Sequence, residues 1–112
     1  LEVADDYYKR AYGLMYRDEL DFGKGMLFIH DQEEIQTYWM KNTHIDLAIF
    51  FINKKGVIVD IKTMKAFDET PISSEFPAFY AIEVPVQWYY FSNVSVGNEV
   101  KGINSERRDY EK

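Results

Sequence analysis

The stretch "DLAIFFINKKGVIVDIKTMK" (Asp46–Lys65) decides the fold, because it holds two strands and the turn that joins them. All of Leu47–Ile52 is apolar, so a strand over residues 46–53 presents apolar side chains on both of its faces. A strand of this kind lies in the middle of a sheet that is covered on both sides. The segment Asn53–Gly56 predicts a hairpin turn, since glycine readily takes the left-handed conformation that such turns require. We therefore expect residues 57–65 to return antiparallel beside the first strand.

Outward from this hairpin, short apolar runs alternate with turn residues. In the returning strand, Asp60 and Lys62 are expected to face water. Further strands are expected over residues 1–4, 26–30, 35–41 and 79–84, with a loop over 68–77 and a helical turn over 87–91. An amphipathic helix is expected over residues 6–15, and its apolar face would carry Tyr8, Ala11, Tyr12 and Met15. Together these elements predict a β-rich α+β fold. Its mostly antiparallel sheet is expected to curl into a small barrel or sandwich with one or two short helices packed on it.

The composition excludes several classes of protein. The 112 residues include no cysteine, which rules out disulfides, thiolate catalysis and cysteine-ligated metal sites. The formal net charge of −6 opposes non-specific binding to nucleic acid and to anionic membranes. From the length we expect one globular domain over residues 1–103, followed by a charged C-terminal tail over residues 104–112 that frays.

The sequence leaves the cellular location open. No apolar run approaches the ~20 residues of a membrane-spanning helix, and no signal peptide is recognisable, so we expect a soluble chain. The first residue is Leu1 rather than methionine. A cytoplasmic protein and a protein from which an upstream export signal has been removed therefore both remain as alternatives.

Four segments of the chain resemble a known family. They are "RAYGLMYR" (Arg10–Arg17), "GMLFIH" (Gly25–His30), "WMKNT" (Trp39–Thr43) and "PAFYAIEV" (Pro77–Val84), in this order. They are similar to the family of small proteins called domain of unknown function 192, and the resemblance covers residues 1–103. This family has no established activity, and it includes soluble forms and forms that follow an export signal. The resemblance therefore implies no reaction.

The chain departs from the family pattern after the "WMKNT" segment. The family usually continues there with Leu-Ile-Pro-Leu-Asp, whereas this chain continues with His44-Ile45-Asp46-Leu47-Ala48. A role of the family aspartate would pass to Asp46, which lies two residues earlier and hence on the same face of a strand.

Polar side chains gather in the stretch "TYWMKNTHID" (Thr37–Asp46). One interpretation is a strand end, where Trp39 and Met40 pack and the following residues shape a corner through side-chain bonds to the backbone. The other is the polar rim of a cleft that binds an anionic or carbonyl-bearing ligand. The residues assigned to this ligand site are Lys41, Asn42, Thr43, His44 and Glu83.

Glu83 is unusual because it lies on an otherwise apolar strand. A partly buried glutamate usually has a partner, for which Lys41 and Arg17 are the candidates. The alternative is hydrolysis by a carboxylate pair that joins Glu83 to Asp46 or Glu75. The sequence contains no nucleophile elbow, no His-Glu-x-x-His motif and no P-loop.

Two further groups of residues have competing interpretations. The methionines and the histidines His30 and His44 show no tight ligand spacing, so we expect core packing, no metal site and no cofactor. In "QWYYF" (Gln87–Phe91), not every ring can be buried, and Trp88, Tyr89 and Tyr90 are assigned to an interaction surface for a partner or a sugar.

The leading hypothesis is a non-enzymatic binding or accessory domain with a polar pocket near Lys41–His44. Its partner would be an unknown small molecule or a protein, with no nucleic acid and no insertion into a membrane. The alternatives are a hydrolase-like enzyme that uses Glu83 and Asp46, and a homodimerisation module that docks through Trp88–Phe91.

Overall fold

The structure, a computed structural model, describes residues 1–103, and within them it contains two sheets and two short helices. The elements are β1 (Glu2–Ala4), α1 (Tyr7–Tyr12), β2 (Met26–Glu34), β3 (Thr37–Tyr38), β4 (Leu47–Ile52), β5 (Ile58–Met64), β6 (Ile72–Ser73), β7 (Ala78–Pro85) and α2 (Val86–Phe91). The larger sheet has the order β1-β2-β7-β4-β5, and the smaller sheet pairs β3 with β6. Among the strands of residues 1–103, only β1 and β2 pair in parallel. The predicted tail, residues 104–112, lies outside the described residues.

The central hairpin of the sequence analysis is confirmed. All six residues of β4 are buried, and β4 lies between β7 and β5. At the turn, the Asn53 N–H donates a hydrogen bond to the Val57 carbonyl at 2.9 Å. Gly56 has a φ of 91°, the left-handed conformation that the turn required. The apolar pattern therefore identified both the hairpin and the internal position of β4 in the sheet.

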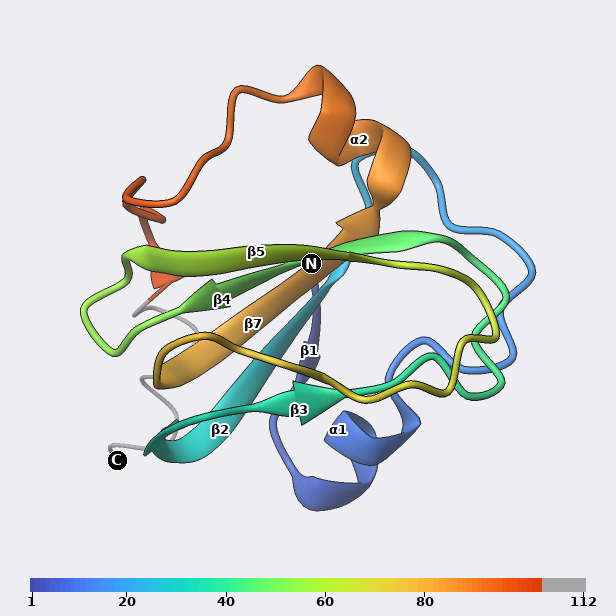
Figure 1. Ribbon diagram of the computed structural model, residues 1–112, viewed down its shortest axis with the longest axis horizontal. Coiled ribbons are helices and arrows are strands. Elements are labelled where there is room, and N and C mark those ends of the chain that lie inside the picture. The colour runs from blue at the N-terminus through green and yellow to red at the C-terminus, as the bar shows by residue number, and fades with distance from the viewer. Residues whose placement is uncertain (104–112) are drawn as a thin grey trace.

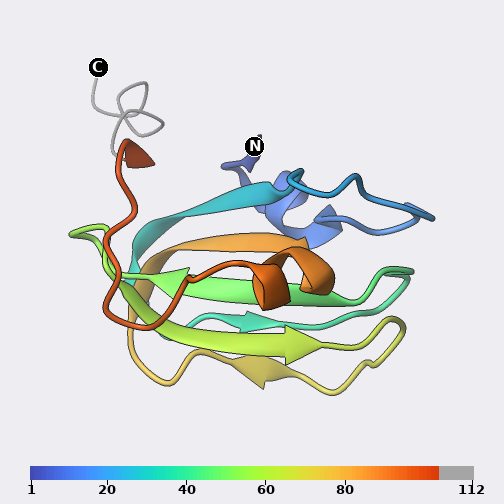
Figure 2. The same ribbon diagram turned by 90° about the horizontal axis from the view of Figure 1, so that it is seen from above.

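The larger sheet is covered differently on its two faces, as Figure 1 shows. On one face, here called the α2 face, α2 packs against a core that includes Phe50, Tyr80 and Ile82; Figure 2 looks down onto this helix. On the opposite face, the α1 face, lie α1 and the smaller sheet, over a core that includes Phe51 and Met64.

The larger sheet is open. Its outermost strands, β1 and β5, do not pair with each other, so the sheet does not close into the barrel that was considered from the sequence. The β-rich α+β class, the mostly antiparallel sheet and the two short helices are confirmed.

The edge strand β5 differs from its predicted orientation. Asp60 pairs with Phe51 and Lys62 pairs with Ile49, so both polar residues lie on the α1 face of the sheet. The Asp60 side chain is 16% exposed and accepts a hydrogen bond from the Glu75 N–H at 2.9 Å. The expectation that Asp60 faces water is wrong, because the segment that follows β6 folds over this edge.

The helix α1 is shorter than predicted. Asp6 caps it as expected, accepting a hydrogen bond from the Lys9 N–H at 2.8 Å. The helix ends at Gly13, whose φ is 52°. None of its residues is buried, and Tyr8 and Tyr12, expected on a packed apolar face, are 80% and 53% exposed. The expected amphipathic packing is therefore wrong.

Two other segments also differ from the sequence analysis. The strand expected over residues 35–41 shrinks to β3, and the loop expected over residues 68–77 contains β6. Each short strand exists because it pairs with the other. The sequence pattern of neither segment predicts this pairing, because the two strands are far apart in the chain.

Gly25 marks a close approach between β2 and β7. A Cβ atom at this position would lie 2.5 Å from the Glu83 carbonyl oxygen and 3.0 Å from Cγ1 of Val84. The backbone oxygen cannot rotate away, because Glu83 lies within the central strand β7.

We expect Gly25→Ala to lower the free energy of unfolding by about 3 kcal/mol, the upper part of the range for overpacked sites. Lys24→Ala, in the same loop, is the control and should stay within about 0.5 kcal/mol of wild type. Urea denaturation of the three proteins measures the difference. Equal midpoints for Gly25→Ala and wild type would contradict the close approach.

Candidate functional site

A cavity of about 340 Å³ opens beneath α1, on the α1 face of the larger sheet. Its volume falls within the roughly 300–1,000 Å³ that is usual for small-molecule sites. Its walls come from α1 and the segment after it, from β2, from β3 and the segment after it, and from β7. The lining residues include Tyr7, Arg10, Ala11, Tyr12, His30, Tyr38, Trp39, Thr43 and Glu83.

Glu83 projects into this cavity from the middle of the sheet. It pairs with Met26 on β2 and with Ile49 on β4, so its neighbours in the sheet are apolar. Its exposed fraction is 5%. Among residues 1–103, no side-chain hydrogen bond or ion pair engages the Glu83 carboxyl group. Burial raises the pKa of Glu83 from its usual 4.5 to about 8, so the carboxyl group is mainly protonated at neutral pH.

The partners expected for Glu83 are engaged elsewhere. Arg17 forms an ion pair with Glu2, with Nη2 2.7 Å from Oε1. The Lys41 ammonium lies 5.2 Å from the centre of the Trp39 ring, in a cation–π arrangement. The expected structural ion pair of Glu83 is therefore wrong.

A chain of hydrogen bonds runs along another wall of the cavity. The Tyr38 hydroxyl donates to Oε1 of Gln36 at 2.8 Å and lies 2.7 Å from Nε2 of His30. Because the Tyr38 hydroxyl donates its proton to Gln36, it is the acceptor in the bond with His30. His30 Nε2 therefore carries the proton and is the donor in that bond. Burial, together with the charge of Arg10, lowers the pKa of His30 to about 4. His30 is therefore a neutral donor at physiological pH.

Tyr38 is influenced by both charged groups of the cavity. Its pKa is raised well above its usual value, mainly by burial and further by Glu83, while Arg10 acts in the opposite direction. Tyr38 is therefore neutral and lies within electrostatic range of both Glu83 and Arg10.

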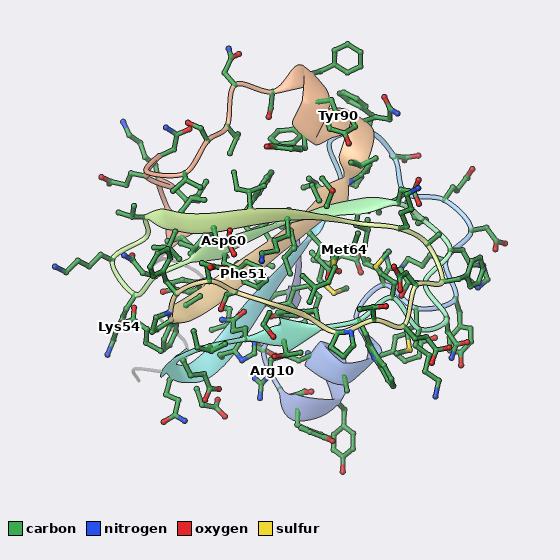
Figure 3. The ribbon with its side chains drawn as sticks, viewed as in Figure 1. Arg10, Phe51, Lys54, Asp60, Met64 and Tyr90 are labelled. Atoms are coloured by element: carbon green, nitrogen blue, oxygen red, sulfur yellow. The ribbon has the colours of Figure 1, made fainter. Side chains whose placement is uncertain are left out.

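Arg10 forms the cationic part of the wall. Its Nη1 donates to the Ile29 carbonyl at 2.9 Å, and its Nη2 lies 3.6 Å from an Asp31 carboxylate oxygen. Figure 3 shows Arg10 on the side of the sheet that carries Phe51 and Met64, with Tyr90 on the other side. The guanidinium group is thus anchored to β2 rather than paired with Glu83.

Of the five residues assigned to a ligand site, the structure brings two to the cavity, Thr43 and Glu83. Thr43 is buried and donates a hydrogen bond from Oγ1 to the Lys41 carbonyl at 3.2 Å. Lys41, Asn42 and His44 do not line the cavity.

The remaining residues of the turn have local partners. Asn42 has a φ of 54° and donates from Nδ2 to the Tyr16 hydroxyl at 2.9 Å. His44 Nδ1 lies 2.9 Å from an Asp18 carboxylate oxygen, and its ring packs 4.7 Å from Phe67. Asn42 therefore takes the left-handed backbone conformation at the corner, but its side chain bonds to another side chain rather than to the backbone as the strand-end interpretation proposed.

Sequence reasoning missed Arg10 and Tyr38 and considered His30 only as a metal ligand. Arg10 and His30 lie in the "RAYGLMYR" and "GMLFIH" segments, which could have drawn attention to them. No local pattern signals that these segments meet across one cavity, because α1 and β2 are joined by a long irregular connection.

The carboxylate pairs considered for hydrolysis do not meet in the cavity. Neither Asp46 nor Glu75 lines it. Asp46 Oδ1 accepts a hydrogen bond from the Ala66 N–H at 2.8 Å, and Glu75 lies 3.6 Å from Lys62 Nζ. Within residues 1–103, no three histidine, aspartate or glutamate side chains cluster as a metal site would require.

The aromatic segment on α2 divides between packing and exposure. Trp88 and Tyr89 contact Phe50, with ring centres 6.3 and 5.6 Å apart. Tyr90 is exposed, and so is Phe91. In the part of the chain that the structure describes, no helix is long and apolar enough to cross a membrane.

Two solved structures are similar to this fold. A protein of unknown function from Novosphingobium aromaticivorans DSM 12444 has a TM-score of 0.83 and 29% sequence identity, over 88% of this chain and 71% of its own. A protein from Sinorhizobium meliloti 1021, described as a proposed transcription regulator, has a TM-score of 0.84 and 33% identity, over 88% of this chain and 77% of its own. No curated protein matches the chain.

The family resemblance drawn from the four sequence segments is confirmed by a match of residues 1–102 to the family model DUF192, described as an uncharacterised ACR. With this match over most of its length, the chain belongs to the DUF192 family.

Proposed function

We propose that this domain binds a small molecule in the cavity beneath α1, with Glu83 as the main polar contact. The observation that carries the proposal is a carboxyl group that is 5% exposed, has no side-chain partner among residues 1–103 and lines a cavity of ligand size. This proposal moves the ligand site from the turn Lys41–His44, where the sequence predicted it, to the cavity that Glu83 lines. Thr43 belongs to its wall, and Lys41 covers the ring of Trp39 at the edge.

The energetic cost of Glu83 supports a functional role. A buried carboxyl group without a hydrogen-bond partner destabilises a folded protein by roughly 1–3 kcal/mol. An apolar residue would continue the core formed by Met26 and Ile49 without that cost. Residues that break the local pattern in this way are expected at functional sites.

The competing functions have less support. The net charge of −6 gives no basis for extending the description of the Sinorhizobium protein, a regulator of transcription, to this chain, and we expect no binding to nucleic acid. Hydrolysis by Glu83 and Asp46 has no geometric basis, because Asp46 lies outside the cavity. Docking through Trp88–Phe91 would use mainly Tyr90 and Phe91, because the other two rings pack on Phe50.

A thermal-shift screen of metabolites, sugars and amines, combined with two variants of α1, tests the proposal. Ala11→Trp places an indole in the mouth of the cavity, whereas Tyr8→Trp alters an exposed position outside it. A ligand at 100 times its Kd adds about 2.7 kcal/mol of stability. We expect this gain in wild type and in Tyr8→Trp, and its loss in Ala11→Trp. A screen in which no compound stabilises the protein, or in which Ala11→Trp retains the full gain, would overturn the proposal.

The raised pKa of Glu83 predicts how stability depends on pH. Between pH 4.5 and about 8, the folded protein holds the Glu83 proton more firmly than the unfolded chain, so stability falls as the pH rises. His30, whose pKa is lowered from 6.5 to about 4, acts in the opposite direction between these two values. The effect of Glu83 is therefore clearest from pH 6.5 to 8, where it reaches up to about 1.4 kcal/mol per pH unit.

We expect Glu83→Gln to remove this slope, because an amide does not ionise in this range. Its free energy of unfolding should stay nearly constant from pH 6.5 to 8 while that of wild type falls. Chemical denaturation at half-unit pH steps makes the comparison. Parallel curves for the two proteins would show that Glu83 is not the titrating group.

A further inference from the structure

We propose that the cavity beneath α1 takes an amine ligand, and that the ligand's ammonium group forms an ion pair with Glu83. This inference rests on the proposed function, and it adds the chemical class of the ligand. It follows from which polar groups of the cavity wall are already engaged and from the kind of surface that surrounds the carboxyl group.

The other buried and half-buried polar side chains of the wall already have partners. Arg10 donates to the Ile29 carbonyl, His30 and Tyr38 bond to each other, and Thr43 donates to the Lys41 carbonyl. The Tyr38 proton is directed toward Gln36 and is not available to the carboxyl group. Glu83 is therefore the wall group with the greatest unmet capacity to bind a ligand.

The chemistry of an unpaired, buried carboxylate selects a cation. An anionic ligand would be repelled by Glu83 in its ionised form, and it would find the Arg10 guanidinium already anchored to β2. A neutral hydroxyl group could fill one lone pair but would not compensate the charge. An ammonium group brings a positive charge and up to three N–H donors, which is what a desolvated carboxylate requires.

The surroundings of Glu83 also suit a cation. Tyr7, Tyr12 and Trp39 stand at the cavity with large exposed fractions, and aromatic faces attract ammonium groups. The net charge of −6 raises the local concentration of cations near the protein. Arg10 opposes a cation only weakly, because Asp31 lies 3.6 Å from it and because burial alone accounts for the shift in the pKa of Glu83.

The test uses three probes of the same shape, benzylamine, benzyl alcohol and benzoate, titrated into ¹⁵N-labelled protein at pH 8 and followed by NMR chemical shifts. Wild type is expected to bind benzylamine at least tenfold more tightly than benzyl alcohol, and benzoate more weakly still. Glu83→Gln keeps the size of the side chain and removes its charge. This substitution is expected to weaken the binding of benzylamine at least tenfold and to change the binding of benzyl alcohol by no more than about twofold.

Proton linkage gives a second readout that a merely structural Glu83 would not produce. Binding of an ammonium group requires the ionised carboxyl group, so benzylamine should release a proton and bind up to about tenfold more tightly per pH unit between pH 6.5 and 8. The other titratable groups that line the cavity are Tyr7, Arg10, Tyr12, His30 and Tyr38. His30, with a pKa of about 4, and Tyr38, with its raised pKa, remain neutral throughout this interval. In Glu83→Gln the pH dependence should vanish.

The outcomes separate this inference from the proposed function. If benzyl alcohol or benzoate binds as tightly as benzylamine and Ala11→Trp blocks this binding, the inference of an amine ligand is wrong, but the proposed binding site is retained. Absence of benzylamine binding, or binding that Glu83→Gln does not weaken, would also overturn the amine. The proposed function fails separately, if the broader screen finds no compound whose stabilising effect is lost in Ala11→Trp.

Discussion

The burial of β4 on both of its faces is the constraint on which the rest of the structure depends. Six consecutive apolar residues cannot face water on either side, so the sheet must carry a layer on each face. α2 and the segment after it cover one face, and the smaller sheet with the α1 region covers the other. The second layer is uneven, because α1 itself contributes no buried residue. The cavity lies beneath this helix, and Tyr7, Arg10, Ala11 and Tyr12 of the helix line it.

Glu83 is the exception within this apolar layer. Desolvation of its carboxyl group explains both its free-energy cost to the folded protein and its proposed role in binding a ligand. Desolvation keeps the carboxyl group mainly protonated at neutral pH, and no side chain among the described residues is its partner. The same desolvation would strengthen its interaction with a ligand that brings a charge of opposite sign, since few waters would screen the pair. The wall formed by β2 and β3 contrasts with it, because His30 bonds to the Tyr38 hydroxyl and Tyr38 donates to Oε1 of Gln36, although Nε2 of Gln36 has no hydrogen-bond partner among the described residues. A hydrogen-bonded pair, His30 and Tyr38, and one carboxyl group without a side-chain partner among residues 1–103 thus line the same cavity, an arrangement suited to binding.

The family match and the two similar structures identify the fold, whereas the candidate site rests on the geometry of this chain. Part of that site could be predicted from the sequence. Glu83 stood out because a charged residue interrupted an apolar strand, and Thr43 because it lies in a polar turn. Lys41, Asn42 and His44 shared the turn but do not line the cavity. Lys41 lies over the ring of Trp39, whereas Asn42 and His44 bond to Tyr16 and Asp18, because adjacent residues in a tight turn project in different directions. Arg10 could not be assigned from the sequence, since its approach to β2 depends on how α1 crosses the sheet.

The sequence by itself determined the central hairpin, its turn at Gly56 and the burial of both faces of β4, because these features depend on side-chain alternation and on one glycine conformation within about twenty consecutive residues. It also determined that Glu83 would be an anomaly. Only the tertiary structure decided that β7 lies between β2 and β4, which sets Glu83 between Met26 and Ile49. It likewise decided that β3 pairs with β6 and that α1 stands over a cavity. These arrangements join segments that are far apart in the chain, and their partners are selected by the packing of the whole core, which no local pattern encodes.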